Sequence, residues 1–221
     1  MRFGIFYEHQ LPRPWSRESE YRLLQDSLTQ IELADRLGYD YAWEVEHHFL
    51  EEYSHSSAPE VFLGAASQRT KRIRLGHGVI QLPTNHPIRV AERVSTLDLL
   101  SGGRVELGLG EAQGPVELHP FGRRVRDKRD VWEEAVRALV PCFTQECVEF
   151  HGQFFDRRRE NTDMAVNDNR SAPAKIIRAF AADQSKLDLF VAPVFANERL
   201  GRTNQVGIVA AAQTPVRGKQ H

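Results

Sequence analysis

The sequence predicts an α/β fold in which parallel strands and helices alternate, as in a TIM-like (β/α)₈ barrel. Short apolar segments of strand length alternate with longer segments of helical periodicity, and four such units fit into residues 1–143. A doubly wound nucleotide-binding sheet has the same rhythm, but its first strand-to-helix turn carries a glycine-rich phosphate loop. The corresponding turn here, EHQLPRPWSRE from Glu8, contains no glycine, which favours the barrel.

The first unit combines a short buried strand with an amphipathic helix. The segment RFGIFY, residues 2–7, is apolar, aromatic and too short for a helix, which is typical of a parallel strand covered on both faces. Over residues 21–37 apolar side chains recur at helical spacing, and Gly38 stands where a helix stop is expected. These apolar positions are Leu23, Leu24, Leu28, Ile31, Leu33, Ala34 and Leu37.

The next three units repeat this pattern. A helix over residues 59–68 is expected to turn Val61, Phe62, Ala65 and Ala66 inward. The remaining expected elements are strands at residues 39–45, 72–80 and 104–110, a helix at 86–103 that two glycines close, and a fourth amphipathic helix at 127–143.

Composition and charge argue against several classes of protein. The formal net charge is -1, from 29 basic and 30 acidic residues, so there is no overall field for nucleic acid or an anionic membrane. The longest apolar runs, such as LFVAPVF from Leu189, are far below the roughly 20 residues of a membrane-spanning helix, and the start lacks a signal-peptide core. We expect a cytosolic protein. Its two cysteines, Cys142 and Cys147, lack metal-site spacing and are expected to be buried or idle thiols.

Titratable side chains gather where the predicted strands end. In a barrel the active site lies at the carboxyl ends of the strands. Glu8 and His9 follow the first strand, and the segment EHHF, residues 46–49, follows the second. QLPTNHP follows the third strand and GLGEAQG the fourth. The sequence therefore predicts acids, imidazoles and small residues on one shared rim.

Three motifs carry a resemblance to a known family. EHHF after the second strand, LPTNHPIRVAERVSTLDLLSGGRVELGLG at residues 82–110 and FHGQFFD at residues 150–156 occur in order and with the right separations. With them, residues 1–156 resemble the luciferase-like flavin-dependent monooxygenases. The resemblance implies a TIM-like barrel that binds reduced FMN, or a deazaflavin in some relatives, and uses oxygen to oxidise an aldehyde, an alkane or a similar organic substrate.

The resemblance assigns the catalytic role to the second strand's end. His47 matches the active-site histidine of the family, and an imidazole that titrates near neutrality suits protonating or stabilising an oxygenated flavin. The alternative is a histidine that is merely hydrogen-bonded at a strand end. Glu46 resembles the carboxylate that holds the histidine tautomer, although it could instead cap a backbone turn. His48 is expected to orient its neighbour or to pack below the rim.

The resemblance places the flavin ring against the third strand. Gly76 and Gly78 leave the backbone open to a flat ligand, and the peptide Gly78–Val79 matches one that is often cis in the family. The alternative reading of both glycines is a bulge or a tight interior layer of the barrel. Asn85 is expected at the flavin edge and Glu92 near the ring, with a surface role as the alternative for each.

The loop after the fourth strand departs from the family pattern. Related proteins often have an arginine there for the flavin phosphate, whereas this sequence has Glu111. A carboxylate repels a phosphate, so the phosphate binds elsewhere or more weakly. Gly108 and Gly110 are accordingly assigned only to close backbone approach of the flavin.

The segment after residue 156 does not continue the pattern. We divide the chain into a barrel portion, residues 1–156, and a divergent tail, residues 157–221, with one or two short elements in AKIIRAFAADQSKLDLFVAPVF and QVGIVAAAQ. A complete barrel needs four more units, so the barrel is expected to be incomplete. The chain would then be a truncated product, a shortened flavoprotein relative, or one subunit of a barrel completed by a partner. Unpaired strand edges would favour association with a like or unlike subunit.

Two functions follow from this sequence. The first is a monooxygenase whose reduced FMN comes from a separate flavin reductase, because the chain has no dinucleotide fingerprint. The second is a flavin-binding protein without turnover, or an inactive fragment. The expected partners are an organic substrate, oxygen and the reductase, with neither nucleic acid nor membrane.

Overall fold

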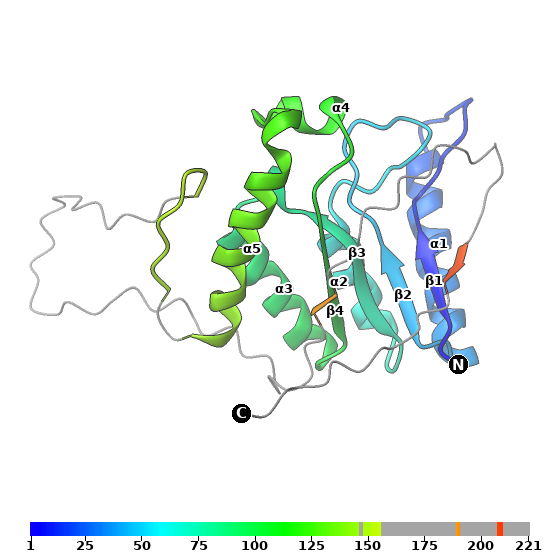
Figure 1. The fold of residues 1–221 in the computed structure, drawn as a ribbon. Helices are drawn as coiled ribbons and strands as arrows, with labels where there is room; N and C mark the ends of the chain where they lie inside the picture. Colours follow the sequence, from blue (N-terminus) through cyan, green and yellow to red (C-terminus); the bar gives the residue numbers. More distant parts are fainter. Residues whose placement is uncertain (146–147, 156–188, 191–206, 210–221) are drawn as a thin grey trace, which may run out of the picture.

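A computed structural model describes residues 1–145, 148–155, 189–190 and 207–209. Its strands form one six-stranded sheet in the order β5-β4-β3-β2-β1-β6 (Figure 1). The strands are β1 (Gly4–Tyr7), β2 (Tyr41–Glu44), β3 (Arg74–Gln81), β4 (Val105–Gly110), β5 (Leu189–Phe190) and β6 (Gly207–Val209). The helices are α1 (Ser19–Leu37), α2 (Pro59–Arg69), α3 (Pro87–Ser101), α4 (Pro115–Leu118) and α5 (Lys128–Thr144), with 3₁₀ turns η1 (Leu82–Thr84), η2 (His119–Phe121) and η3 (Val125–Asp127).

The order of the strands is that of a barrel rather than of a doubly wound sheet. Strands β1 to β4 are parallel, and each pairs with the next along the chain, with Gly4 opposite Tyr41 and Tyr41 opposite Arg74. In a doubly wound sheet the strand order would instead reverse at a switch point, so that some consecutive strands would not be neighbours. The predicted parallel α/β fold is therefore confirmed, and all four strand ends reach the same rim, at the top of Figure 1.

The helices begin and end close to the predicted positions. Helix α1 ends at Gly38, whose φ of 85° is the left-handed conformation that glycine adopts without strain. Helix α3 ends in the same way at Gly102, with a φ of 72°. In the last turn of α1, the Asp35 carboxylate accepts hydrogen bonds from the backbone N–H groups of Lys71, Arg72 and Ile73, at 2.7–3.0 Å. This fixes the loop that enters β3.

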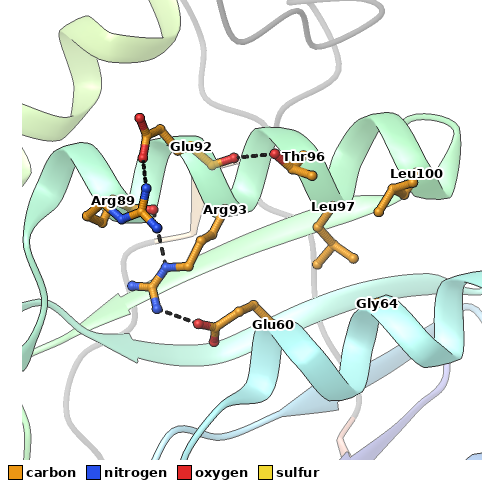
Figure 2. Close-up of a pocket in the computed structure, with 8 residues that line it drawn as sticks. All are labelled: Glu60, Gly64, Arg89, Glu92, Arg93, Thr96, Leu97 and Leu100. Carbon is orange, nitrogen blue, oxygen red and sulfur yellow. Dashed lines mark hydrogen bonds and ion pairs between the residues drawn. The ribbon is translucent and has the colours of Figure 1, made fainter.

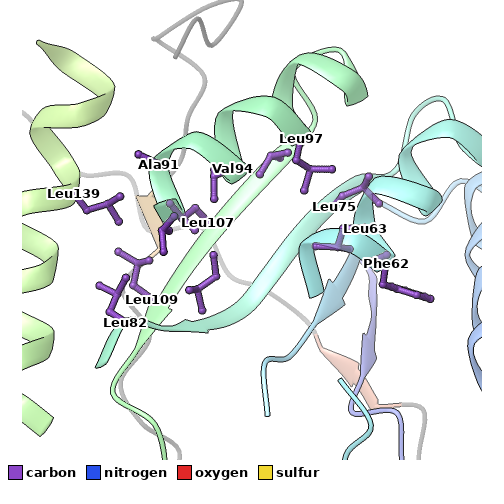
Figure 3. Packing of buried hydrophobic residues seen from close by; sticks show 14 of the residues in the cluster. Phe62, Leu63, Leu75, Leu82, Ala91, Val94, Leu97, Leu107, Leu109 and Leu139 are labelled. Carbon is purple, nitrogen blue, oxygen red and sulfur yellow. The ribbon is translucent and has the colours of Figure 1, made fainter. Parts of the chain in front are cut away.

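One face of the sheet packs against the helices and forms the core. Leu75 of β3 and Leu107 of β4 point into this layer, where Leu63 and Val94 meet them from α2 and α3 (Figure 3). The prediction for α2 was half right. Phe62 and Ala66 are buried, but Val61 is 70% exposed and Ala65 is also exposed, because α2 turns Leu63 toward the sheet instead.

The opposite, inner face of the sheet is built of aromatic rings and glycine. A Cβ atom on Gly76 would lie 2.2 Å from the Trp43 ring, and one on Gly78 would lie 3.2 Å from Phe6. Hence Phe6 and Trp43 share this face with both glycines. The register of β3 on β4 shifts between His77 and Ile80, and the peptide Gly78–Val79 in this bulge is cis, as the resemblance implied.

Two short strands fall within the stretches expected in the tail. Strand β5 pairs in parallel with β4, and β6 pairs antiparallel with β1. The other predictions for residues 157–221, the domain boundary after residue 156, and Cys147 lie outside the described residues. Within the described ranges, no helix is long and apolar enough to cross a membrane.

A candidate active site at the carboxyl ends of the strands

His47 lies at the rim, three residues beyond the end of β2. Its backbone N–H donates to the Ser56 carbonyl at 2.8 Å, and its side chain is only 10% exposed. Ring atom Nδ1 lies 2.8 Å from Oε1 of Glu117, in α4, and Nε2 lies 3.5 Å from Oε2 of Glu8, which follows β1. The imidazole therefore stands between two carboxyl groups that come from two other strand ends.

Glu117 is the buried anion of the site. Its Oε1 accepts hydrogen bonds from His47 Nδ1, from the His48 backbone N–H at 3.2 Å and from the Gln81 side-chain amide at 2.7 Å. Its Oε2 accepts one from the Gln113 backbone N–H at 3.0 Å. Burial alone would raise the pKa of Glu117, but the hydrogen bonds from His47, Gln81 and Gln113 outweigh it and lower the pKa to about 2. The carboxylate is therefore ionised at any physiological pH.

Glu46 and His48 form a second pair beside the first. Glu46 Oε1 lies 2.9 Å from His48 Nε2 and accepts from the Asn85 side-chain amide at 2.8 Å, while Oε2 accepts the Gln81 backbone N–H at 2.8 Å. The structure thus differs from the prediction that Glu46 holds the tautomer of His47. Glu46 contacts His48, and Glu117 occupies the place beside His47, because the chain after β4 folds back over the rim as α4.

Glu8 is the carboxyl group on the Nε2 side of His47. Burial raises its pKa, against the opposing effect of His47, and Glu44 also raises it. The Tyr53 hydroxyl hydrogen-bonds to the Glu8 carboxyl, and the Tyr53 ring lies edge-on to His47 with ring centroids 5.5 Å apart. No hydrogen-bond partner for Glu8 Oε2 exists among the described residues.

A further buried polar group lies just below the rim. The Ser56 hydroxyl donates to Glu44 Oε1 at 2.5 Å, and His9 Nδ1 lies 2.8 Å from the same oxygen. Burial raises the pKa of Glu44.

The non-glycine residues with positive φ in the described ranges are His9, Phe49, Glu51 and Ala112, and each lies in a loop that follows a strand. Such backbone conformations concentrate at functional sites, so they too mark this rim.

The predicted cofactor-binding glycines have two different explanations. The space beside Gly76 is filled by Trp43, and the spaces beside Gly108 and Gly110 are filled by the His77 carbonyl and the Val79 side chain. Packing within the sheet therefore accounts for the absence of side chains at these three positions. Gly78 and Val79 remain partly exposed on the bulge. The contact of any of these residues with a flavin stays a prediction.

Asn85 and Glu92, the two polar residues expected near the flavin, are both bound to other side chains of the protein. The side-chain amide of Asn85 donates to Glu46, and its oxygen accepts from Arg93 at 2.6 Å, so the side chain is held within the protein. Glu92 pairs with Arg89 and lines a cavity of about 260 Å³ between α2 and α3 (Figure 2). The structure does not bring Glu92 together with His47, which agrees with the alternative of a surface role.

Glu111 is not an isolated negative charge in its loop. Its Oε1 accepts a hydrogen bond from Arg129 Nη1 at 2.8 Å, and Lys128 Nζ lies 3.8 Å from its Oε2. Both cations belong to α5. The predicted repulsion of a flavin phosphate is therefore offset in part by two neighbouring cations.

Sequence analysis missed Glu117 and Gln81 and did not include Glu8 among the site residues. Gln81 is the last residue of β3, and its amide joins the Glu46 backbone carbonyl, at 2.7 Å, to Glu117. Glu117 belongs to a helix of only four residues, too short for any periodicity to reveal. The available signal was position: an acid shortly after a strand end, next to a glycine and a proline that form a helix start.

Comparisons with known proteins give a family match over most of the chain. The family described as luciferase-like monooxygenase matches residues 1–177. Limonene 1,2-monooxygenase of Rhodococcus erythropolis is 41% identical over 136 residues, which are 60% of this chain and 33% of that protein. The monooxygenase RslO1 of Streptomyces bottropensis has a TM-score of 0.65 and 34% identity, over 70% of this chain and 46% of that one.

A second solved structure supports the fold alone. The oxygenating constituent of 3,6-diketocamphane monooxygenase from Pseudomonas putida, in complex with FMN, has a TM-score of 0.64 and 24% identity, over 71% of this chain and 43% of that one. The chain spans less than half the length of the curated relatives it matches.

Proposed function

Since the chain belongs to the luciferase-like monooxygenase family, we propose that it is a flavin-dependent monooxygenase that binds reduced FMN on the inner face of β3. In this proposal oxygen and the flavin oxidise a small organic substrate, such as an aldehyde or an alkane, beside His47. The observation that carries the proposal is the position of His47, held between Glu117 and Glu8 at the rim that Gly78 and Val79 approach.

The inner face beside the bulge suits a flat aromatic ring. Phe6, Trp43, Gly78 and Val79 are only partly buried there, and they offer aromatic and aliphatic surface without a charge. Ligand sites are mostly surfaces of this kind with a few polar groups at one edge. We assign the polar edge to the imidazole of His47, because its Nδ1 lies 3.5 Å from the side-chain amide of Gln81 at the end of β3, and with this assignment the residues present fit the isoalloxazine of a flavin.

His47 is suited to proton transfer because its tautomer is fixed. Nδ1 faces the permanent anion Glu117 and therefore carries a proton, which leaves Nε2 as the basic atom of the neutral ring. The flavin, when bound, supplies the activation of oxygen. The protein supplies the oriented imidazole and a largely buried setting, in which one atom, Nε2, takes up a proton and passes it on.

A separate reductase as the source of the reduced flavin follows from the same reading. The described residues include no glycine-rich dinucleotide loop after β1, and the flavin-dependent trigonelline monooxygenase of Acinetobacter baylyi, 28% identical over 145 residues, is named as an oxygenase component. We infer the same division of labour for this chain. A deazaflavin is the alternative cofactor, and association with a like or unlike subunit belongs to the proposal as well.

The alternative function is flavin binding without turnover. Glu111 favours it, since a carboxylate stands in the loop where related proteins often have an arginine for the flavin phosphate. Such a protein would keep the apolar inner face of β3 and would not turn over an organic substrate.

Binding and turnover separate these functions. The purified chain is titrated with FMN, reduced FMN and a deazaflavin, and the reduced complex is then exposed to oxygen with a long-chain aldehyde. Saturable binding with oxygen-dependent product supports the monooxygenase, and binding without product assigns the alternative. The absence of binding to all three cofactors contradicts both.

A His47→Ala variant tests the residue assignment. We expect the fold to be retained with a lower melting temperature, because Glu117 loses its hydrogen bond from His47. FMN affinity should be unchanged, and product formation should fall by about 10²-fold, which is the usual contribution of a proton-transfer group. Turnover equal to that of the unaltered chain would remove His47 from the reaction.

A further inference from the structure

The two carboxyl groups that flank His47 have opposite surroundings. Glu117 is 1% exposed and receives four hydrogen bonds, whereas Glu8 Oε2 receives none within the part of the chain that the structure describes. Pairs of acids whose environments drive their pKa values apart are the usual basis of acid and base roles in one site. One of these two acids is therefore a fixed anion, and the other is free to exchange a proton.

The groups around Glu8 favour its neutral form. Burial raises its pKa, and the negative charges of Glu44 and Glu117 raise it further. His47 and the Tyr53 hydroxyl act in the opposite direction. The direction of the pKa shift is upward, so burial and the two neighbouring acids prevail.

We propose that Glu8 stores the proton that His47 delivers, passing it from Oε2 to Nε2 across the 3.5 Å that separates them. The destination of that proton is the reaction described above, so this inference rests on the proposed function. The separation is longer than a formed hydrogen bond, as is common for catalytic acid–base pairs before a ligand closes the site.

The proton and the charges of this transfer are accounted for by Glu8, His47 and Glu117. The O–H bond of the Glu8 carboxyl breaks and an N–H bond forms at His47 Nε2, which leaves a carboxylate and an imidazolium. Glu117 stabilises the imidazolium through Nδ1 at 2.8 Å and does not itself take up the proton, because its pKa of about 2 is far too low. The Glu8 side chain is 23% exposed, but Oε2 itself is buried, so the carboxyl group must rotate to regain its proton from water after the step.

A pH titration of the flavin-free chain tests directly whether Glu8 holds a proton above the ordinary pKa of glutamate. The carboxyl carbon of Glu8 is followed by ¹³C NMR in protein with labelled glutamate, and its signal is assigned by its loss in Glu8→Gln. We expect its pKa to lie above the ordinary glutamate value of 4.5. In Tyr53→Phe it should titrate higher still, since the hydrogen bond from Tyr53 lowers the pKa of Glu8. The exposed Glu52 gives the control, and Glu52→Gln should leave the signal unchanged.

Turnover tests the delivery. In Glu8→Gln we expect about 10²-fold slower product formation with unchanged FMN affinity. In the unaltered chain the rate should fall as pH rises and Glu8 loses its proton, and this fall should be absent in Glu8→Gln. An ordinary or lowered Glu8 titration overturns the proposal, and so does a Glu8→Gln variant with unaltered rate and pH profile. Failure of the proposed function would appear separately, as absent flavin binding or product with the Glu8 titration still raised.

Discussion

Replacing Glu117 by glutamine should reveal how much the fold depends on the buried anion beneath His47. The substitution keeps the size of the side chain and removes its charge. An amide oxygen in the place of Oε1 can still accept from His47, His48 and Gln81, but the amide nitrogen in the place of Oε2 would face the Gln113 N–H, which is also a donor.

The magnitude follows from the pKa of Glu117. Burial raises this pKa, but the hydrogen bonds from His47, Gln81 and Gln113 bring it from 4.5 to about 2, which corresponds to at most about 3 kcal/mol of folding free energy. A pKa that is depressed in the folded state contributes stability above the unfolded value of 4.5, and that stability is lost as pH falls toward 2. At pH 3 the contribution should have fallen to about 1.4 kcal/mol.

The assay is urea unfolding of the two proteins at pH 7 and at pH 3. We expect Glu117→Gln to be less stable by up to about 3 kcal/mol at pH 7, with a gap less than half as large at pH 3. Glu133→Gln is the control, since Glu133 is 41% exposed on α5 and should change stability little at either pH. An equal gap at both pH values for Glu117→Gln would refute the reasoning, because the charge would then contribute nothing.

Two further predictions concern residues outside the His47 pair. His77 is fully buried, without a hydrogen-bond partner among the described residues, and burial together with Arg93 lowers its pKa to about 3, so His77→Leu should stabilise the chain by about 1–3 kcal/mol. The gain should grow as pH falls from 6.5 toward 3, where only the unfolded chain takes up a proton at this histidine, and urea unfolding with no gain at low pH would argue against it. Glu111→Gln should free Arg129 and Lys128 and strengthen the binding of FMN a few-fold while leaving riboflavin unchanged, and an equal effect on both ligands in parallel titrations would dismiss a phosphate site in this loop.

The strand–helix alternation and the position of the rim could be predicted because both depend on local patterns. Apolar runs and helical periodicity predicted the strands β1 to β4 and the helices α1, α2, α3 and α5, and the absence of a glycine loop after β1 favoured the observed order of the strands. The inward face of α2 was predicted poorly, since Val61 and Leu63 are equally apolar and only the packing of α2 decides which one is buried.

The partners within the site could not be predicted from spacing. Glu46 precedes His47 directly in the chain, yet adjacent side chains on an extended segment point in different directions, and Glu46 contacts His48 instead. Glu117 reaches His47 across 70 residues of sequence, through a helix too short to leave a pattern. Gly76 shows the converse, since its missing side chain makes room for Trp43.

The most direct test of the account is whether a flavin binds on the inner face of the sheet at Gly78. The chain has three tryptophans, and Trp15→Phe combined with Trp132→Phe leaves Trp43, which lies beside Gly78, as the single emitting tryptophan. We predict that FMN quenches Trp43 fluorescence saturably, with the same midpoint as the change in FMN's own fluorescence, and that Gly78→Val abolishes both. Binding of FMN that leaves Trp43 unquenched, or that survives Gly78→Val, would contradict the account.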